Sequence, residues 1–92
     1  MGVTLKGYLR CADARQAARV ENALQMHIDL TRAEPGCISF NVTPTDDPLV
    51  WYVEEEFVDP QAFEAHQTRA QSSHWARETA GIARDYKIDG LE

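Results

Sequence analysis

Residues 54–75 constrain the fold more than any other stretch, because the spacing of apolar side chains changes abruptly at Asp59. Upstream, the side chains of residues 49–58 are expected to point alternately to two faces, and both faces carry apolar side chains. This is typical of a β-strand covered on both sides. Asp59-Pro60 then offers an N-cap and a proline at the first helical position, where its missing N–H costs nothing. The apolar side chains that follow recur at helical spacing. A strand therefore ends where a capped helix begins.

Two further segments, residues 3–10 and 37–44, also alternate and predict half-buried strands. Between them, Asp13 is an N-cap with Gln16 as its capping-box partner, so a helix begins there. That helix carries apolar side chains at helical spacing and ends at Pro35-Gly36, because glycine tolerates the left-handed conformation that closes many helices.

The last part of the chain completes the order of elements. The helical pattern loosens at residues 71–73, where we expect a break. A second helical piece then carries four side chains along one side: Trp75, Thr79, Ile82 and Tyr86. Residues 86–91 form a final strand. The order βαββαβ predicts one α+β domain over residues 1–92, with a ferredoxin-like four-stranded antiparallel sheet and its helices on one face.

Charge and composition exclude several classes of function. The net charge is −6 and no basic cluster stands out, which argues against nucleic-acid binding because phosphates require neutralisation. No apolar run approaches the roughly 20 residues that cross a bilayer, and the start of the chain lacks a signal-peptide pattern. We therefore expect a cytoplasmic protein. Cys11 and Cys37 lack the spacing of metal ligands and are expected to be reduced thiols.

Three short motifs carry a resemblance to a known family. They are residues 34–37 (EPGC), Glu55 followed two positions later by Phe57, and residues 62–66 (AFEAH). In this order and spacing they resemble the antibiotic biosynthesis monooxygenase family of dimeric α+β barrels, over roughly residues 3–90. The resemblance implies a homodimer whose sheets pack into a barrel, and a pocket between each sheet and its helices.

Members of that family catalyse different reactions. They include cofactor-independent monooxygenases of quinols or polyketide-like phenols, haem-degrading enzymes, a sugar-phosphate isomerase and proteins with no known reaction. The fold therefore says little about chemistry, and the function has to be argued from the site.

His66 and Glu55 are the candidate catalytic residues. His66 lies one turn beyond Phe63 and is expected to point at the sheet, while Glu55 lies on the otherwise apolar face of its strand. A neutral imidazole can remove a proton when a partner fixes its tautomer, and Glu55 is the expected partner. The alternative is a structural pair in which each group satisfies the other, since an isolated buried carboxylate is costly.

Four aromatic side chains are candidates for contact with a flat substrate: Trp75, Phe40, Trp51 and Phe63. Trp75 is expected to close the pocket and the others to line it. Aromatic residues at these spacings also form ordinary hydrophobic cores, so both interpretations stay open.

The sequence departs from the family pattern at two places. Many relatives carry a second histidine five residues after the first, where this chain has Gln71, which disfavours a two-histidine mechanism. Haem-degrading relatives use an asparagine on the first strand, which is absent from residues 3–8. No cluster has metal-ligand spacing, so no metal or cofactor is expected. His27 is interpreted as a partly exposed rim residue and His74 as an exposed one.

The resulting hypothesis is a homodimeric, cofactor-independent monooxygenase that acts on a small quinol-like or polyketide-like aromatic. His66, oriented by Glu55, removes the phenolic proton, and the anion reacts with dioxygen in a dry pocket. Two alternatives remain. An isomerase or tautomerase uses the same pair without oxygen, and a non-catalytic module holds a metabolite without converting it.

Overall fold

The computed structural model describes residues 2–91, which form four strands and three helices. In chain order these are β1 (Val3–Arg10), α1 (Ala14–Arg32), β2 (Cys37–Pro44), β3 (Val50–Phe57), α2 (Pro60–Gln71), α3 (His74–Glu78) and β4 (Ala83–Asp89). None of these helices is both long and apolar enough to cross a membrane. Cys11 and Cys37 are free thiols.

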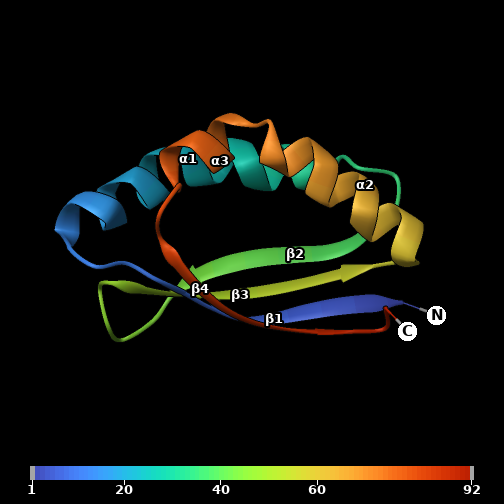
Figure 1. The fold of residues 1–92 in the computed structure, drawn as a ribbon, viewed down its shortest axis with the longest axis horizontal. Coiled ribbons are helices and arrows are strands. Elements are labelled where there is room, and N and C mark those ends of the chain that lie inside the picture. The colour runs from blue at the N-terminus through green and yellow to red at the C-terminus, as the bar shows by residue number, and fades with distance from the viewer. Residues whose placement is uncertain (1, 92) are drawn as a thin grey trace.

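The four strands make one antiparallel sheet in the order β2-β3-β1-β4. All three helices lie over the same face of this sheet, which gives a two-layer molecule (Figure 1). This is the ferredoxin-like arrangement that the order of elements predicted.

The helix starts form as their sequences predict. The Asp13 side chain accepts a hydrogen bond from the Gln16 backbone N–H. The Gln16 side chain accepts one from the N–H of Ala12, the residue before the N-cap, so the reciprocal bond differs by one residue from that of a capping box. The Asp59 side chain accepts from the Ala62 N–H at the start of α2. These caps fix where α1 and α2 leave the sheet, and so which of their residues face it.

The sheet face toward the helices, here called the inner face, is apolar except at one position in its centre. Along β3 the inward side chains of Trp51, Val53, Glu55 and Phe57 are all buried. Glu55 pairs across the sheet with Leu5 of β1 and Phe40 of β2. A carboxyl group therefore lies inside an otherwise hydrophobic row, as the alternation of residues 49–58 predicted.

The end of the chain differs from the expectation. The second helical piece stops at Glu78, and the last strand begins at Ala83 instead of residue 86. Gly81 adopts φ +84°, a left-handed conformation that turns the chain back toward the sheet. Tyr86, expected on the helix, lies on β4 opposite Gly7, where a Cβ on Gly7 would collide with the Asp85 carbonyl. The break before α3 is confirmed, with Ser73 as N-cap.

The start of β4 at Ala83 determines which side chains its inner face carries. Arg84, Tyr86 and Ile88 lie opposite Leu9, Gly7 and Leu5, which face the helices. The outward positions of β4 carry Asp85, Lys87 and Asp89. Two polar side chains of β4 are thereby directed toward the space between the two layers.

Candidate active site

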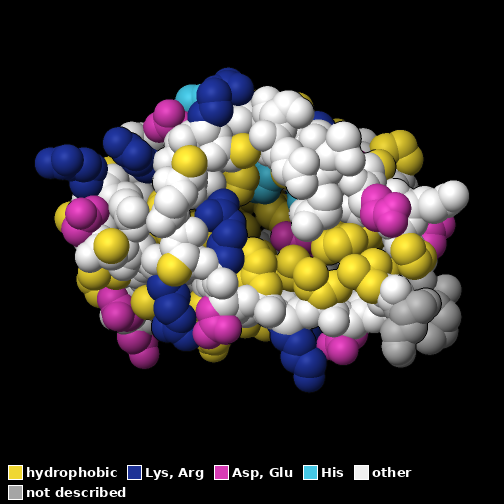
Figure 2. Space-filling view, viewed as in Figure 1, with side chains coloured by type: hydrophobic (Ala, Val, Ile, Leu, Met, Phe, Trp, Pro, Cys, Tyr) yellow, Lys and Arg dark blue, Asp and Glu magenta, His cyan; other side chains and the backbone are white. Residues whose placement is uncertain are grey.

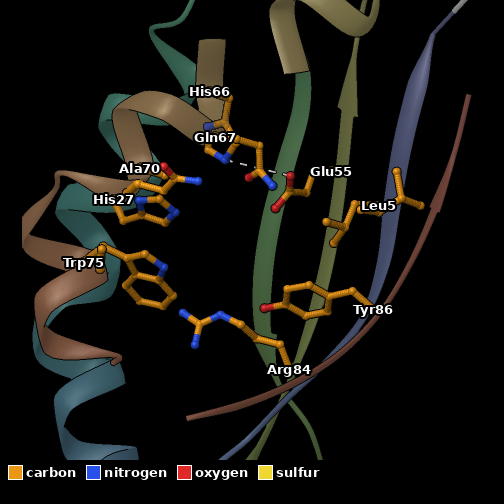
Figure 3. A pocket seen from close by; sticks show the side chains of 12 residues that line it. Leu5, His27, Glu55, His66, Gln67, Ala70, Trp75, Arg84 and Tyr86 are labelled. Carbon is orange, nitrogen blue, oxygen red and sulfur yellow. Dashed lines mark ion pairs between the residues drawn. The ribbon is translucent and has the colours of Figure 1, made fainter. Parts of the chain in front are cut away.

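A cavity of about 260 Å³ lies between the helices and the sheet. In the space-filling view it is a hollow with hydrophobic, histidine and acidic side chains inside it and a basic side chain at its edge (Figure 2). His27, His66 and Trp75 line it from the helix side, and Glu55, Tyr86 and Arg84 line it from the sheet side (Figure 3). The two residues singled out from the sequence, His66 and Glu55, thus share one cavity.

His66 is buried on α2, with 3% of its side chain exposed, and each ring nitrogen has a different neighbour. Nδ1 lies 2.9 Å from Oε1 of Glu34, and Nε2 lies 3.9 Å from Oε1 of Glu55. Because a carboxylate only accepts hydrogen bonds, Nδ1 carries a proton and donates the hydrogen bond to Glu34. In the neutral ring, Nε2 is therefore the basic nitrogen, and it faces Glu55 across the cavity.

Glu34 is the hydrogen-bond partner of His66, which corrects the expectation that Glu55 orients the ring. Oε2 of Glu34 accepts a hydrogen bond of 2.5 Å from Nε of Arg69, and Arg69 also donates to the Thr31 hydroxyl at 2.9 Å. Arg69 is one turn beyond His66 on α2, so one carboxylate receives two donors from the same helix. Because Arg69 holds the Glu34 carboxylate in place, the hydrogen bond to Glu34 holds the His66 ring in one orientation.

Burial determines the protonation state of His66. Its pKa is lowered, first by burial, while the charge and hydrogen bond of Glu34 act in the opposite direction and Arg69 adds to the lowering. A histidine whose pKa lies below its usual value is neutral at neutral pH. His66 is therefore in the form that can accept a proton.

Glu55 is buried without a hydrogen bond to Oε1 from any of residues 2–91. Burial, followed by the negative charge of Glu34, raises the pKa of Glu55 to about 7. The carboxyl group therefore changes its protonation state near neutral pH, unlike an ordinary glutamate. It can accept or donate a proton in the cavity, depending on the pH.

The interpretation of His27 as a rim residue is wrong. Only 4% of it is exposed, and its ring stacks on Trp75 with a centroid distance of 4.6 Å and an interplanar angle of 3°. Burial lowers the pKa of His27 to about 3, and the charges of Arg69, Arg84 and, once it is protonated, His66 act in the same direction. The ring is neutral, and Nδ1 has no partner among the described residues.

The four aromatic candidates separate into two groups. Trp75 lines the cavity, and its indole and the His27 ring form one flat wall. Phe40, Trp51 and Phe63 are not among its lining residues, so the geometry of this cavity does not support their expected contact with a substrate. Phe40 packs edge-on against His27, and Phe63 packs edge-on against Phe57. Phe40, Trp51 and Phe63 are all buried core residues.

Arg84 and Tyr86 of β4 line the cavity, although the sequence does not predict it. The helical spacing of Trp75, Thr79, Ile82 and Tyr86 predicts a helix through this segment. Burial raises the pKa of Tyr86 to about 12, so its hydroxyl keeps its proton. The Arg84 guanidinium is tied to the end of α3 by hydrogen bonds to Thr79 and Ile82. Gln71 also lines the cavity, whereas His74 is exposed as expected.

Within residues 2–91, no group of three or more His, Cys, Asp or Glu side chains is arranged to hold a metal ion. The polar groups of the cavity include two neutral imidazoles, a carboxyl that titrates near neutral pH, a phenol, a guanidinium and two side-chain amides. Such a set can transfer protons and bind oxygen atoms of a small molecule.

The buried neutral His27 predicts a specific dependence of stability on pH. Because its pKa is about 3 in the folded protein, against 6.5 for an ordinary histidine, the stabilisation is complete above pH 6.5 and is lost as the pH falls toward 3. The expected loss is about 1.4 kcal/mol of unfolding free energy per pH unit. In His27→Phe this contribution is absent, so the difference between the two proteins changes with pH.

Urea denaturation at a series of pH values measures this difference, since the other titrating groups are common to both proteins. His74→Gln, at an exposed histidine, is the matched control and should run parallel to the wild type. Equal pH slopes for His27→Phe and wild type would contradict a neutral buried His27.

Comparison with known proteins agrees with this architecture. Residues 3–78 match the antibiotic biosynthesis monooxygenase family. Among proteins with a curated description, none matches the sequence. A solved structure from Nitrosomonas europaea, named for the same family, is 26% identical with a TM-score of 0.79 and covers 100% of both chains. A Pseudomonas aeruginosa structure is 27% identical with a TM-score of 0.73, over 96% of this chain and 89% of that one.

A more distant structure is SnoaB from Streptomyces nogalater, a cofactor-independent oxygenase. It is 13% identical with a TM-score of 0.79, over 99% of this chain and 93% of its own, and at that identity it shows the shared fold alone. The family match covers most of the described residues, including β1 to α3 and both His66 and Glu55. The chain belongs to the antibiotic biosynthesis monooxygenase family.

Proposed function

We propose that the protein is a cofactor-independent monooxygenase that oxidises a small electron-rich aromatic with an acidic hydroxyl group, such as a quinol or a polyketide-like phenol. The observation that carries the proposal is a neutral His66 whose Nε2 faces a 260 Å³ cavity while Nδ1 is held by Glu34 at 2.9 Å. The family match supports oxygen chemistry, and SnoaB, with the same fold, is described as a cofactor-independent oxygenase.

In this proposal His66 is the general base. Nε2 accepts the proton of the substrate hydroxyl, and the positive charge that then forms on the ring is stabilised by Glu34 through Nδ1. Above the Glu55 pKa of about 7, the Glu55 carboxylate, 3.9 Å from Nε2, adds a second negative charge. Arg69 keeps Glu34 in place, so it acts as a positioning residue.

The deprotonated aromatic then reduces dioxygen. A ring carbon of the anion forms a bond to one oxygen atom, which gives a hydroperoxide once a proton returns to the outer oxygen. Loss of water then breaks the O–O bond and leaves a carbonyl on that carbon, whose hydrogen departs as a proton. One oxygen atom enters the product, the other leaves as water, and the substrate supplies the electrons. In this proposal the flat wall of Trp75 and His27 covers the anion and limits its contact with water.

The proposed enzyme is a homodimer. The sheet face away from the helices exposes Tyr8 and Ile38, and the Tyr8 and Tyr52 rings pack at 5.5 Å. Exposed aromatic and aliphatic side chains on a sheet are typical of an interface, and the family resemblance implies a homodimer. We propose that two copies pack through this face.

Sedimentation equilibrium should give a dimer at micromolar concentration, and a monomer at every concentration tested would contradict the interface.

Removing the proposed base tests the reaction. We expect His66→Ala to lower kcat at least about 100-fold, the usual contribution of a positioned acid–base group. Oxygen consumption and product formation with a panel of naphthohydroquinones and anthrones measure the effect. His74→Ala is the matched control, because His74 is an exposed histidine. Unchanged turnover in His66→Ala, with an intact circular dichroism spectrum, would exclude His66 as the base.

A tautomerase or isomerase is a second candidate, favoured by one observation. Glu55 and His66 approach the cavity from opposite layers, and protonated Glu55 can return a proton to a position other than the one His66 deprotonated. This reaction consumes no oxygen. Product formation in an anaerobic assay would favour it, and tight binding without turnover in any assay would favour a non-catalytic module.

The pH dependence of the rate distinguishes the two reactions. The Glu55 pKa is raised to about 7, so its carboxylate form predominates only above that pH. For the monooxygenase, where the carboxylate stabilises the imidazolium, kcat/KM should rise as the pH increases through 7. For the tautomerase, where the protonated acid is needed, it should fall. Glu55→Gln should flatten either change, and a wild-type profile without a transition near 7 would contradict a role for Glu55.

A further inference from the structure

Arg84 lines the cavity and has no counter-ion among residues 2–91. It is the one Lys or Arg among the residues that line the cavity, and it is exposed to solvent on its other side. The ion pairs found within residues 2–91 join other residues: Lys6 to Glu54, Arg10 to Asp85, His66 to Glu34 and Glu55, and Arg69 to Glu34. A full positive charge therefore remains available at the cavity of a protein with net charge −6.

The Arg84 guanidinium is also held in place. One terminal nitrogen donates to the carbonyl oxygens of Thr79 and Ile82 at 3.1 and 2.9 Å, and the other donates to the Thr79 hydroxyl at 2.8 Å. A guanidinium has five N–H donors, so two of them, one on Nε and one on a terminal nitrogen, have no partner in this set. Carbonyl and hydroxyl acceptors orient the group and leave its charge uncompensated.

Tyr86 adds a second donor beside Arg84. The two side chains extend from β4 into the same part of the cavity, and the Tyr86 hydroxyl points toward the helices (Figure 3). With a pKa of about 12, this phenol keeps its proton and can donate a hydrogen bond at any physiological pH. The basic nitrogen of His66 and the Glu55 carboxyl lie at the other end of the view, near Gln67 (Figure 3).

We propose that Arg84 and Tyr86 form an anion subsite that binds a carboxylate of the substrate, at the end of the cavity away from His66 and Glu55. Together with the proposed function, on which the position of the reacting hydroxyl rests, this makes the substrate a flat aromatic hydroxy acid. Its hydroxyl group reaches His66, its carboxylate reaches Arg84, and its ring lies along the Trp75–His27 wall.

Two physical arguments favour a carboxylate over a neutral ligand group. A planar carboxylate matches the geometry of guanidinium N–H donors, and hydrogen bonds between charged groups are stronger than neutral ones. A neutral aromatic in the cavity would remove water from Arg84 without replacing its hydrogen bonds, which is unfavourable. The proposed ligand also accepts from Tyr86, so it satisfies both polar groups of β4 at once.

A matched pair of air-stable probes tests the subsite without any turnover. 6-Hydroxy-2-naphthoate and 2-naphthol share one ring system with a hydroxyl, and only the first has a carboxylate at the opposite end. We expect isothermal titration calorimetry on the full chain to give at least about tenfold tighter binding of the acid, because the guanidinium is partly solvated and its ion pair correspondingly weakened. Equal affinities for the two probes would overturn the proposal.

Variants assign the preference to Arg84. Arg84→Gln should abolish the advantage of the acid while 2-naphthol binds as before, and Tyr86→Phe should reduce it. Lys87→Gln removes a charge from the outer face of the same strand and should keep the wild-type ratio. If Arg84→Gln melts too early to be titrated, Arg84→Lys should retain part of the preference. A wild-type ratio in Arg84→Gln or in Tyr86→Phe would exclude that residue from the subsite.

These measurements separate the subsite from the reaction. Preference for the acid together with no oxygen-dependent turnover of any hydroxy acid would support the subsite and contradict the monooxygenase. Oxygen-dependent turnover of neutral quinols without any preference for the acid would support the monooxygenase and overturn the anion subsite. Loss of the preference when Lys87→Gln replaces the wild type would show that general charge, and not Arg84, attracts the acid, and would overturn the proposal.

Discussion

The hydrogen bond between Glu34 and His66 is the contact on which the site depends. It joins the turn after α1 to the middle of α2, and Arg69 of α2 donates a second hydrogen bond to the same carboxylate. Because Glu34 accepts from Nδ1, the basic nitrogen of His66 is directed into the cavity. One contact thus positions two helices and selects the tautomer that a general base requires.

The cavity concentrates groups that ordinary cores exclude. Glu55 and His27 are buried with polar atoms that have no partner among residues 2–91. The pKa of Glu55 is raised and that of His27 is lowered, and both shifts favour the neutral form. Unpartnered buried polar groups are costly, which favours the proposed binding of a ligand at these groups over a purely structural role. A ligand that donates to Glu55 and His66 and accepts from Arg84 would supply missing partners, which connects the proposed reaction with the proposed substrate class.

The sequence predicted the order of elements and the direction of Glu55 and His66, because capping residues and alternating spacing are local signals. It could also have revealed His27, which lies seven residues after Val20 and four before Thr31 on the buried stripe of α1. Glu34 and β4 were harder to predict. The contact between Glu34 and His66 spans 32 positions, and the assignment of residues 83–86 to a strand depends on pairing with β1. Neither leaves a local pattern.

The central claim is that His66 is a neutral base protonated on Nδ1, and nitrogen-15 NMR of its imidazole tests this most directly. At neutral pH we predict a protonated Nδ1 shift and an unprotonated Nε2 shift for His66, with loss of the single tautomer in Glu34→Ala. A doubly protonated ring at neutral pH, or a proton on Nε2 with a bare Nδ1, would contradict the account.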